Sequence, residues 1–272
     1  MACSLSELFG LAFVAFVLFS MSNRVQYYVK MTFFLLTAFI FAVSPIPLML
    51  PWPRDYRNAL IPAWCIVKVG HLIGASYELQ GLEHIKRGNG AVVLINHQSA
   101  IDLIVLGKIW PVIGRATQVA KIELFYVLPF GIACWLWGTL FINRNHKSSA
   151  REAINKETKA INEKKSKIII FPEGQRSQSE TLLPFKKGSF HVAIQAQCPI
   201  QPVVVSRYTF LDSKQKIFGR GQSVIRVLPE VKTEGLTKDD LNELVTKVQN
   251  LMQEEFDKIN DELAAKESKK LN

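Results

Sequence analysis

Apolar, β-branched runs alternate with amphipathic stretches through the middle of the chain. The runs predict strands at residues 77–81, 91–95, 118–120, 139–142, 168–171, 201–206 and 223–228. Helical spacing of apolar residues predicts helices at residues 103–109, 148–163 and 187–195. Such alternation is typical of one mixed β-sheet covered by helices. We therefore expect an α/β domain over residues 54–230.

The first 53 residues are strongly apolar, and only Glu7, Arg24 and Lys30 among them are charged. The apolar run at residues 8–21 is short for a membrane span, whereas residues 31–50 have about the length that a span needs. A short polar turn at residues 22–30 separates the two runs, and prolines end the second. We predict that residues 1–53 form an apolar helical hairpin that anchors the chain in the membrane.

The orientation of this hairpin stays open. Arg24 and Lys30 on one side balance Arg54 and Arg57 on the other. The positive-inside rule therefore does not decide whether the pair crosses the membrane or lies in one leaflet. A buried hairpin of a soluble protein is the alternative to membrane attachment. No basic residue precedes the first apolar run, which argues against a cleaved secretory signal.

A further apolar stretch, residues 124–142, lies inside the predicted domain. Pro129, Gly131 and Gly138 interrupt it. These breaks favour an interfacial or re-entrant helix followed by a strand over a third membrane segment. Its tryptophans at positions 135 and 137 suit a water–lipid boundary and suit a protein core equally well.

Residues 231–272 have the pattern of one amphipathic helix. Residues 237–240 resemble a helix start, and apolar residues then recur at helical spacing as far as Ile259. We expect this helix to pack on the α/β domain, with partner or membrane binding as the alternative. The last four residues, Lys269-Lys270-Leu271-Asn272, resemble the dilysine signal of endoplasmic reticulum membrane proteins. That resemblance predicts an endoplasmic reticulum membrane protein whose tail and α/β domain face the cytosol.

The net charge of +10 is unevenly distributed along the chain. Residues from Lys232 onward carry −3, so the residues before it hold +13. Such an excess attracts nucleic acid, acidic lipid headgroups or phosphorylated substrates. The interleaved aromatic and basic stripes expected for nucleic acid are absent, so we predict no nucleic-acid partner. The cysteines and histidines show no ligand spacing, and we predict no metal.

Candidate chemistry begins at residues 92–102, which read VVLINHQSAID. A buried strand here would deliver His97 and Asp102 at its C-terminal end, where α/β folds place reactive groups. His97 can accept a proton near neutral pH, and Asp102 can fix its tautomer and stabilise its charge. Five residues separate two side chains by about 140° on a helix, so the pair meets only if His97 lies in an irregular turn. A turn or capping role is the alternative for His97.

A second polar cluster follows the predicted strand at residues 168–171. Its turn contains Glu173, Gly174 and Arg176. Glycine permits close approach of a ligand, and the planar arginine fork matches phosphate oxygens. Lys121 and Arg144 adjoin two further predicted strands. If these clusters and the histidine–aspartate pair converge at one edge of the sheet, they form a site for an anionic substrate.

Four blocks of this sequence resemble those of the glycerolipid acyltransferases. They are, in chain order, the His-x4-Asp block at 96–102, then residues 138–144, 171–177 and 200–203. The match runs from about Tyr77 to Glu230. Two more segments, residues 120–125 and 183–188, resemble the eukaryotic lysophosphatidic acid acyltransferases in particular. Gln175 stands where this family usually has threonine, and Gln201 where an apolar residue is common.

This resemblance implies an enzyme that acylates the sn-2 hydroxyl of lysophosphatidic acid and so forms phosphatidic acid. It implies His97 as the general base, assisted by Asp102, with acyl-CoA as a co-substrate and no resident cofactor. The substrate-binding residues that it implies are Lys121, Arg144, Glu173, Gly174 and Arg176. The partners are then acyl-CoA, lysophosphatidic acid and membrane lipids. Direct transfer agrees with the lack of a Gly-x-Ser-x-Gly motif in the sequence.

Two alternatives remain. One is an enzyme of the same fold with another acceptor, such as glycerol-3-phosphate or another lysophospholipid. The other is a non-enzymatic, basic, membrane-bound module that binds acidic lipid or nucleic acid. Replacement of His97 by alanine would leave the function of such a module intact, whereas it would abolish turnover by either enzyme.

Overall fold

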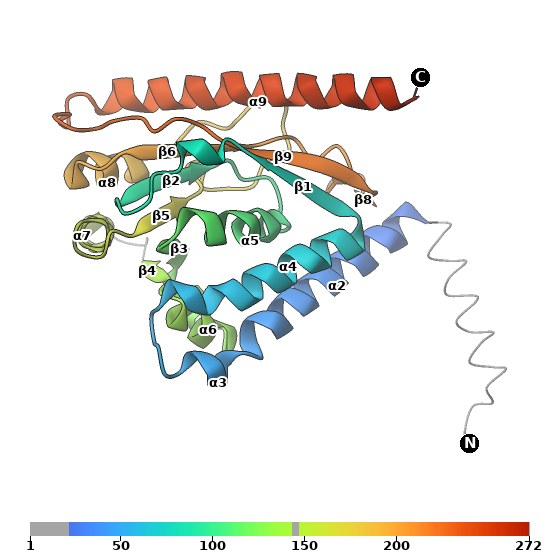
Figure 1. Cartoon of the computed structure of the whole chain (residues 1–272), viewed down its shortest axis with the longest axis horizontal. Helices are drawn as coiled ribbons and strands as arrows, with labels where there is room; N and C mark the ends of the chain where they lie inside the picture. The colour runs from blue at the N-terminus through green and yellow to red at the C-terminus, as the bar shows by residue number, and fades with distance from the viewer. Residues whose placement is uncertain (1–21, 143–146, 272) are drawn as a thin grey trace.

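The computed structural model describes residues 22–142 and 147–271. Its centre is a seven-stranded sheet with the strand order β1-β9-β6-β2-β5-β3-β4 (Figure 1). The strands are β1 (Ala75–Gln80), β2 (Ala91–Ile95), β3 (Ala116–Lys121), β4 (Leu140–Ile142), β5 (Lys167–Ile170), β6 (Ile200–Val205) and β9 (Gly221–Val227). Only β6 and β9 pair antiparallel in this sheet. The mixed α/β fold predicted from the sequence is confirmed.

Helices enclose two apolar cores, one on each side of the sheet. The first core is bounded by α2 (Asn23–Val43), α4 (Leu60–Ile73), α5 (Asp102–Ile113) and α6 (Phe130–Leu136). The second is bounded by α7 (Lys147–Lys164), α8 (Gly188–Ala196) and α9 (Leu241–Leu271). A small hairpin, β7 (Leu211–Asp212) with β8 (Ile217–Phe218), stands apart from the main sheet and contacts α2.

Strand β2 lies at the middle of the sheet, and every one of its residues is fully buried. A strand covered on both faces has apolar residues at every position rather than at alternate ones, which explains the continuous run in the sequence. Strands β3, β5, β2 and β6 all point the same way. Their C-terminal ends therefore meet at one edge of the sheet.

The predicted polar turn at residues 22–30 is wrong, because α2 begins at Asn23 and continues through that segment. The charged side chain that indicated a turn, Lys30, is instead bound by groups distant in the sequence. Lys30 Nζ donates hydrogen bonds to the carbonyl oxygens of Phe218 (2.8 Å) and Gly219 (3.0 Å). The first predicted apolar helix, residues 8–21, lies outside the described residues, as does Arg144.

Helix α2 is long and apolar enough to cross a membrane, and among residues 22–142 and 147–271 it alone meets that test. Only 17% of its apolar window is buried within the protein. It ends at Val43, and the short α3 (Ile46–Met49) follows. The second predicted run, residues 31–50, is therefore divided between two helices.

Helix α4 has no counterpart among the predicted helices. It packs against both α2 and α5. Apolar residues therefore occupy several of its sides, and the one-sided period that marks an amphipathic helix is missing. Residues 124–142, in contrast, contain α6 followed by β4, as expected, and Trp137 is a core residue with 7% exposure.

Helix α9 packs against β6 and α8. Its buried stripe follows the helical period, with Leu244, Val248, Met252, Phe256 and Ile259 all at most 4% exposed. Arg226 on β9 adds ion pairs to Glu255 and Glu262 on this helix. The C-terminal helix is thus an integral layer of the protein.

Candidate active site

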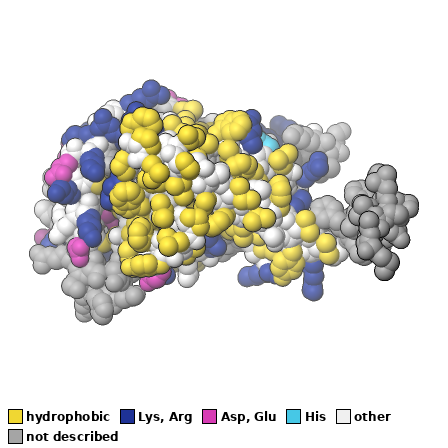
Figure 2. Space-filling view, turned by 90° about the horizontal axis from the view of Figure 1, so that it is seen from below, with side chains coloured by type: hydrophobic (Ala, Val, Ile, Leu, Met, Phe, Trp, Pro, Cys, Tyr) yellow, Lys and Arg dark blue, Asp and Glu magenta, His cyan; other side chains and the backbone are white. Residues whose placement is uncertain are grey.

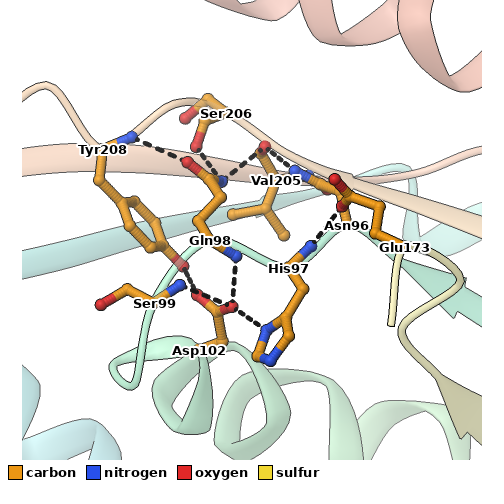
Figure 3. A network of polar contacts seen from close by, with 9 residues as sticks. All are labelled: Asn96, His97, Gln98, Ser99, Asp102, Glu173, Val205, Ser206 and Tyr208. Atoms are coloured by element: carbon orange, nitrogen blue, oxygen red, sulfur yellow. Dashed lines mark hydrogen bonds and ion pairs between the residues drawn. The ribbon is translucent and has the colours of Figure 1, made fainter. Parts of the chain in front are cut away.

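His97 and Asp102 meet at the C-terminal end of β2. His97 Nδ1 lies 2.6 Å from Asp102 Oδ2 (Figure 3). The contact is possible because α5 begins only at Asp102, so the five residues between the two side chains follow a loop rather than a helix. A carboxylate only accepts hydrogen bonds, so Nδ1 carries the proton in a neutral imidazole. The other ring nitrogen, Nε2, is then free to accept a proton.

Four donors surround the Asp102 carboxylate, which is 3% exposed. Oδ2 accepts hydrogen bonds from the backbone N–H groups of Gln98 (2.7 Å) and Ser99 (3.1 Å) as well as from His97. Oδ1 accepts a hydrogen bond from the Tyr208 hydroxyl at 2.7 Å. These bonds offset the cost of burying a charge. The aspartate is therefore held in one orientation toward the imidazole.

Tyr208 follows β6 and is a member of this network that sequence reasoning missed. Its phenol is buried, and burial together with the Asp102 charge raises the pKa of Tyr208 well above its ordinary value. The hydroxyl therefore remains a donor across the physiological pH range. No short motif marks Tyr208, because its partner is distant in the sequence.

Two amide side chains fasten the loop of residues 96–101 to the end of β6 (Figure 3). Asn96 Nδ2 donates to Val205 O (2.9 Å), and Asn96 Oδ1 accepts from Val205 N (2.7 Å). Gln98 Nε2 donates to Ser206 O (2.9 Å), while its Oε1 accepts from Tyr208 N (3.2 Å). Both amides are buried. They position His97 and were also missed from the sequence.

The loop after β5 holds His97 from its other side. The His97 ring stacks on the Phe171 ring, with centroids 4.0 Å apart and an angle of 22° between planes. Ser177 N donates to His97 O at 2.9 Å. Both ends of the loop at residues 171–177 therefore contact His97. The sequence predicted that the His97–Asp102 pair converges with the loop at residues 171–177, with Lys121 and with Arg144. These contacts bring the first two together, while Arg144 lies outside the described residues.

Glu173 was predicted to bind substrate, and the structure places its carboxylate on backbone groups. Oε1 accepts from His97 N (2.8 Å), and Oε2 accepts from Leu183 N (2.9 Å). The residue is 4% exposed. Burial raises the pKa of Glu173, and the two backbone hydrogen bonds oppose that rise. This geometry gives Glu173 a positioning role, while its predicted role in substrate binding stays a prediction.

Cationic side chains lie at the same edge of the sheet. Lys121 ends β3 and is exposed, and Arg176 is exposed in the loop beside Ser177. Gly174 has a φ of +68°, and a Cβ added to it would lie 2.4 Å from Lys186 Nζ. The glycine therefore makes room for a lysine ammonium over the turn. Neither Lys121 nor Arg176 forms an ion pair within the described part of the chain.

An apolar cavity of about 100 Å³ lies beneath α5. Leu103, Leu106 and Gly107 of that helix form one wall, and Ala42 of α2 and Ala63 of α4 form others. The outer sides of α2 and α4 are also apolar. Figure 2 shows this apolar surface, to which Phe33, Leu36, Leu48, Trp52, Trp64 and Leu72 contribute exposed side chains. The cavity and the apolar outer face thus share helices α2 and α4, and Leu103 in the cavity wall directly follows Asp102 in the chain.

Other nucleophiles and metal ligands contribute little to this region. Burial raises the pKa of the Cys134 thiol to about 12 and that of the Cys198 thiol to about 12, so neither is a thiolate at neutral pH. Within residues 22–142 and 147–271, no group of three or more His, Cys, Asp or Glu side chains is arranged to hold a metal ion.

Known proteins resemble this chain over most of its length. A sequence model of the family described as Acyltransferase matches residues 76–206. The human 1-acyl-sn-glycerol-3-phosphate acyltransferase alpha is 36% identical over 232 residues, covering 85% of this chain and 81% of that protein. The human beta enzyme is 32% identical, covering 88% and 87%. The 1-acyl-sn-glycerol-3-phosphate acyltransferase of Saccharomyces cerevisiae is 37% identical, covering 73% and 66%.

A solved structure shares the fold. The crystal structure of the 1-acyl-sn-glycerophosphate acyltransferase PlsC from Thermotoga maritima aligns with a TM-score of 0.62. The alignment covers 86% of this chain and 97% of that one, at 22% sequence identity.

Proposed function

This chain belongs to the acyltransferase family of the relatives just described, and from that premise we propose its reaction. It transfers an acyl group from acyl-CoA to the sn-2 hydroxyl of 1-acyl-sn-glycerol-3-phosphate, giving phosphatidic acid. The observation that carries the proposal is the 2.6 Å contact between His97 Nδ1 and Asp102 Oδ2, which leaves Nε2 as a proton acceptor. The names of the relatives support the choice of acceptor.

In the proposed reaction, His97 Nε2 takes the proton of the acceptor hydroxyl as the oxygen attacks the thioester carbonyl carbon. The new C–O bond forms, the C–S bond breaks, and the sulfur leaves as coenzyme A with the proton from the imidazolium. Asp102 stabilises the imidazolium and fixes the ring tautomer. Its hydrogen bonds from Tyr208, Gln98 and Ser99 keep it in place. Direct transfer requires no covalent acyl-enzyme.

We assign the phosphate of the acceptor to the cationic edge of the sheet. Lys121, Arg144 and Arg176 would bind its oxygens, and Gly174 would permit their close approach. Glu173 would act on the same site by holding the backbone of the loops together. Acyl-CoA is a co-substrate here, and we propose no resident cofactor.

We also propose that the protein is attached to the endoplasmic reticulum membrane with its catalytic domain in the cytosol. The length and apolarity of α2 and the exposed apolar side chains of α3 and α4 support attachment. Such a surface matches the fatty tails of the proposed substrate and product. The net positive charge of the residues before Lys232 would attract phosphorylated lipids at the membrane surface.

An acceptor panel tests the reaction. The full chain in detergent is given one acyl-CoA with lysophosphatidic acid, glycerol-3-phosphate or lysophosphatidylcholine, and products are identified by mass spectrometry. We expect phosphatidic acid to form fastest. Preference for another acceptor would overturn the substrate assignment but keep the reaction class.

A pair of histidine variants tests the mechanism. His97→Ala is expected to lower kcat by ~10²- to 10⁴-fold, the usual contribution of a general base. His191→Ala removes a histidine from α8, outside the site, and should leave turnover unchanged. Full activity of His97→Ala would contradict an enzymatic role for the loop.

A further inference from the structure

A second cavity, of about 510 Å³, lies at the end of the sheet opposite His97. Arg115 just before β3 and Thr117 near its start line it, as do Leu140 at the start of β4 and Ser166 just before β5. These strands run parallel to β2 or to one another. The cavity is therefore separated from the acyl-transfer site by the length of the strands.

Its lining is strongly cationic. Arg54, Arg57, Arg115 and Lys164 line it, and the one acidic residue among its lining is Asp55. Asp55 is already bound by Arg57, whose Nε lies 2.9 Å from Asp55 Oδ2. Three of the four positive charges are therefore left without an acidic partner in the cavity.

Two of these cations are free to bind a ligand. The side chains of Arg54 and Lys164 form no ion pair or hydrogen bond with any residue that the structure describes, and both are exposed. Arg115 is exposed as well, and its guanidinium donates to the backbone oxygen of Lys164 at 3.0 Å. A guanidinium fork and an ammonium across one cavity suit phosphate oxygens.

The cavity is built from firmly attached backbone. Asp55 N donates to Leu136 O at 3.1 Å, and Asn58 Nδ2 donates to the same oxygen at 2.8 Å. Gly138 has a φ of +91°, and a Cβ added to it would approach Arg54 O to 3.2 Å. Close contact between Arg54 and Gly138 thus joins the segment after α3 to the sheet, so a ligand meets a preformed site.

The cavity lies beside the apolar outer face. Pro53 lines the cavity, and the segment before it contains Leu48, Leu50 and Trp52, which are 68%, 60% and 61% exposed. Lys and Arg side chains border the apolar surface at its left edge in Figure 2. If that face lies on the membrane, the cavity opens at the level of the lipid headgroups.

We propose that this cavity binds the phosphate of an anionic membrane phospholipid, as a second lipid site apart from the catalytic one. The inference rests on the membrane attachment proposed above. Phosphatidylcholine also has a phosphate, but its choline balances the charge, so the net positive cavity favours a headgroup without that cation. A free phosphate shares the chemistry and is distinguished by experiment.

Partitioning of the full chain onto vesicles tests the proposal. The Arg54→Gln/Lys164→Gln variant is compared with wild type on vesicles of phosphatidylcholine alone and of phosphatidylcholine with phosphatidylglycerol. The control is Arg24→Gln/Lys68→Gln, which removes two exposed charges from α2 and α4. A basic side chain near an anionic surface contributes ~fivefold to binding. The control therefore measures how much vesicle binding is lost when any two surface charges are removed.

We expect both variants to bind neutral vesicles as wild type does. The measured quantity is the preference for vesicles with phosphatidylglycerol over vesicles without it. This preference should fall at least ~fivefold further in the cavity variant than in the control, because the cavity variant loses a bound phosphate in addition to two surface charges. Acyl transfer in detergent should be unchanged in both variants. Equal losses in the two variants would overturn the site and leave the proposed function intact.

Two further outcomes would overturn the proposal differently. If inorganic phosphate raises the Tm of wild type in detergent but not that of the cavity variant, and also removes the vesicle preference, the ligand is soluble phosphate. If wild type binds neither kind of vesicle, the proposed membrane attachment fails together with this site.

Discussion

The Tyr208 hydroxyl donates a 2.7 Å hydrogen bond to Asp102 Oδ1, the carboxylate oxygen that His97 does not contact. Tyr208 follows β6 and Asp102 begins α5, so 106 residues separate them along the chain. The C-terminal helix supports the contact, because Asn260 Oδ1 on α9 accepts from Arg207 N at 2.9 Å. A residue outside the four sequence blocks thus completes the orientation of the proposed general base.

Removal of this hydroxyl is expected to lower turnover. In Tyr208→Phe, the carboxylate loses the donor that fixes its Oδ1, so Asp102 orients His97 less firmly. We expect kcat to fall ~tenfold, or ~1.4 kcal/mol, with a smaller change in KM. Initial rates over a range of acceptor concentrations measure both constants. The control is Tyr126→Phe, at a side chain that is 72% exposed; equal kcat values for the two variants would remove Tyr208 from the mechanism.

Asp102→Asn should show whether Asp102 orients the His97 ring or only stabilises the fold. A carboxamide has one accepting oxygen, whereas the native carboxylate accepts from His97, Gln98, Ser99 and Tyr208. The imidazole then loses its fixed tautomer, and we expect kcat to fall ~10²- to 10⁴-fold with a small change in KM. Steady-state rates and a thermal unfolding curve check this. A kcat near the wild-type value would show that His97 needs no partner.

Glu173→Gln is expected to change how stability depends on pH. Burial raises the pKa of Glu173 above its ordinary value of 4.5, so the native state binds its proton more tightly than the unfolded state does. Stability from this group is present below pH 4.5 and is lost as the pH rises through the native pKa. Glutamine does not titrate. The free energy of unfolding of wild type minus that of the variant should therefore decrease across this window.

Denaturant unfolding at several pH values measures that difference. Glu152→Gln is a suitable control, because Glu152 is an exposed residue of α7 whose partner Lys156 lowers its pKa. For this control, the free energy of unfolding of wild type minus that of the variant should increase slightly as the pH rises, because the side chain is exposed. A flat curve for Glu173→Gln would mean that the two backbone hydrogen bonds fully offset its burial.

Gly174→Ala is expected to weaken binding of the phosphorylated acceptor. The new Cβ would displace the Lys186 ammonium, and a φ of +68° costs a non-glycine residue ~1 kcal/mol. We expect the acceptor KM to rise several-fold while kcat changes less. Gly188→Ala is the matched control nearby, since a Cβ there meets no atom within 4 Å. Equal acceptor KM values in both variants would show that Gly174 does not contribute to phosphate binding.

The strands and the histidine–aspartate pair could be predicted because their signals are local. A strand buried on both faces leaves a continuous apolar run, and His97 and Asp102 lie in one short block. Helix α4 gave no such signal, because it is apolar on several sides. The polar turn at residues 22–30 was predicted wrongly, because the partners of Lys30 lie at the end of β8 and directly after it, which could not be seen from the sequence.

The supporting residues of the site could not be found from the sequence for a related reason. Phe171 was part of a recognised block, but its stacking on His97 depends on the pairing of β2 with β5. Glu173 was selected as a charge available to substrate, whereas the fold uses both of its oxygens to accept backbone N–H groups. Sequence pattern gives the type of a side chain, but its hydrogen-bond partners depend on the assembled sheet.

The attachment of the loop at residues 171–177 to His97 at both ends has a consequence for engineering. Phe171 and Ser177 are fixed against the imidazole, while Gly174, Gln175 and Arg176 between them are exposed. Under the proposed function, Gln175 and Arg176 can therefore be exchanged to select new headgroup preferences while the proton acceptor keeps its place. Position 174 is reserved for glycine by its φ of +68°.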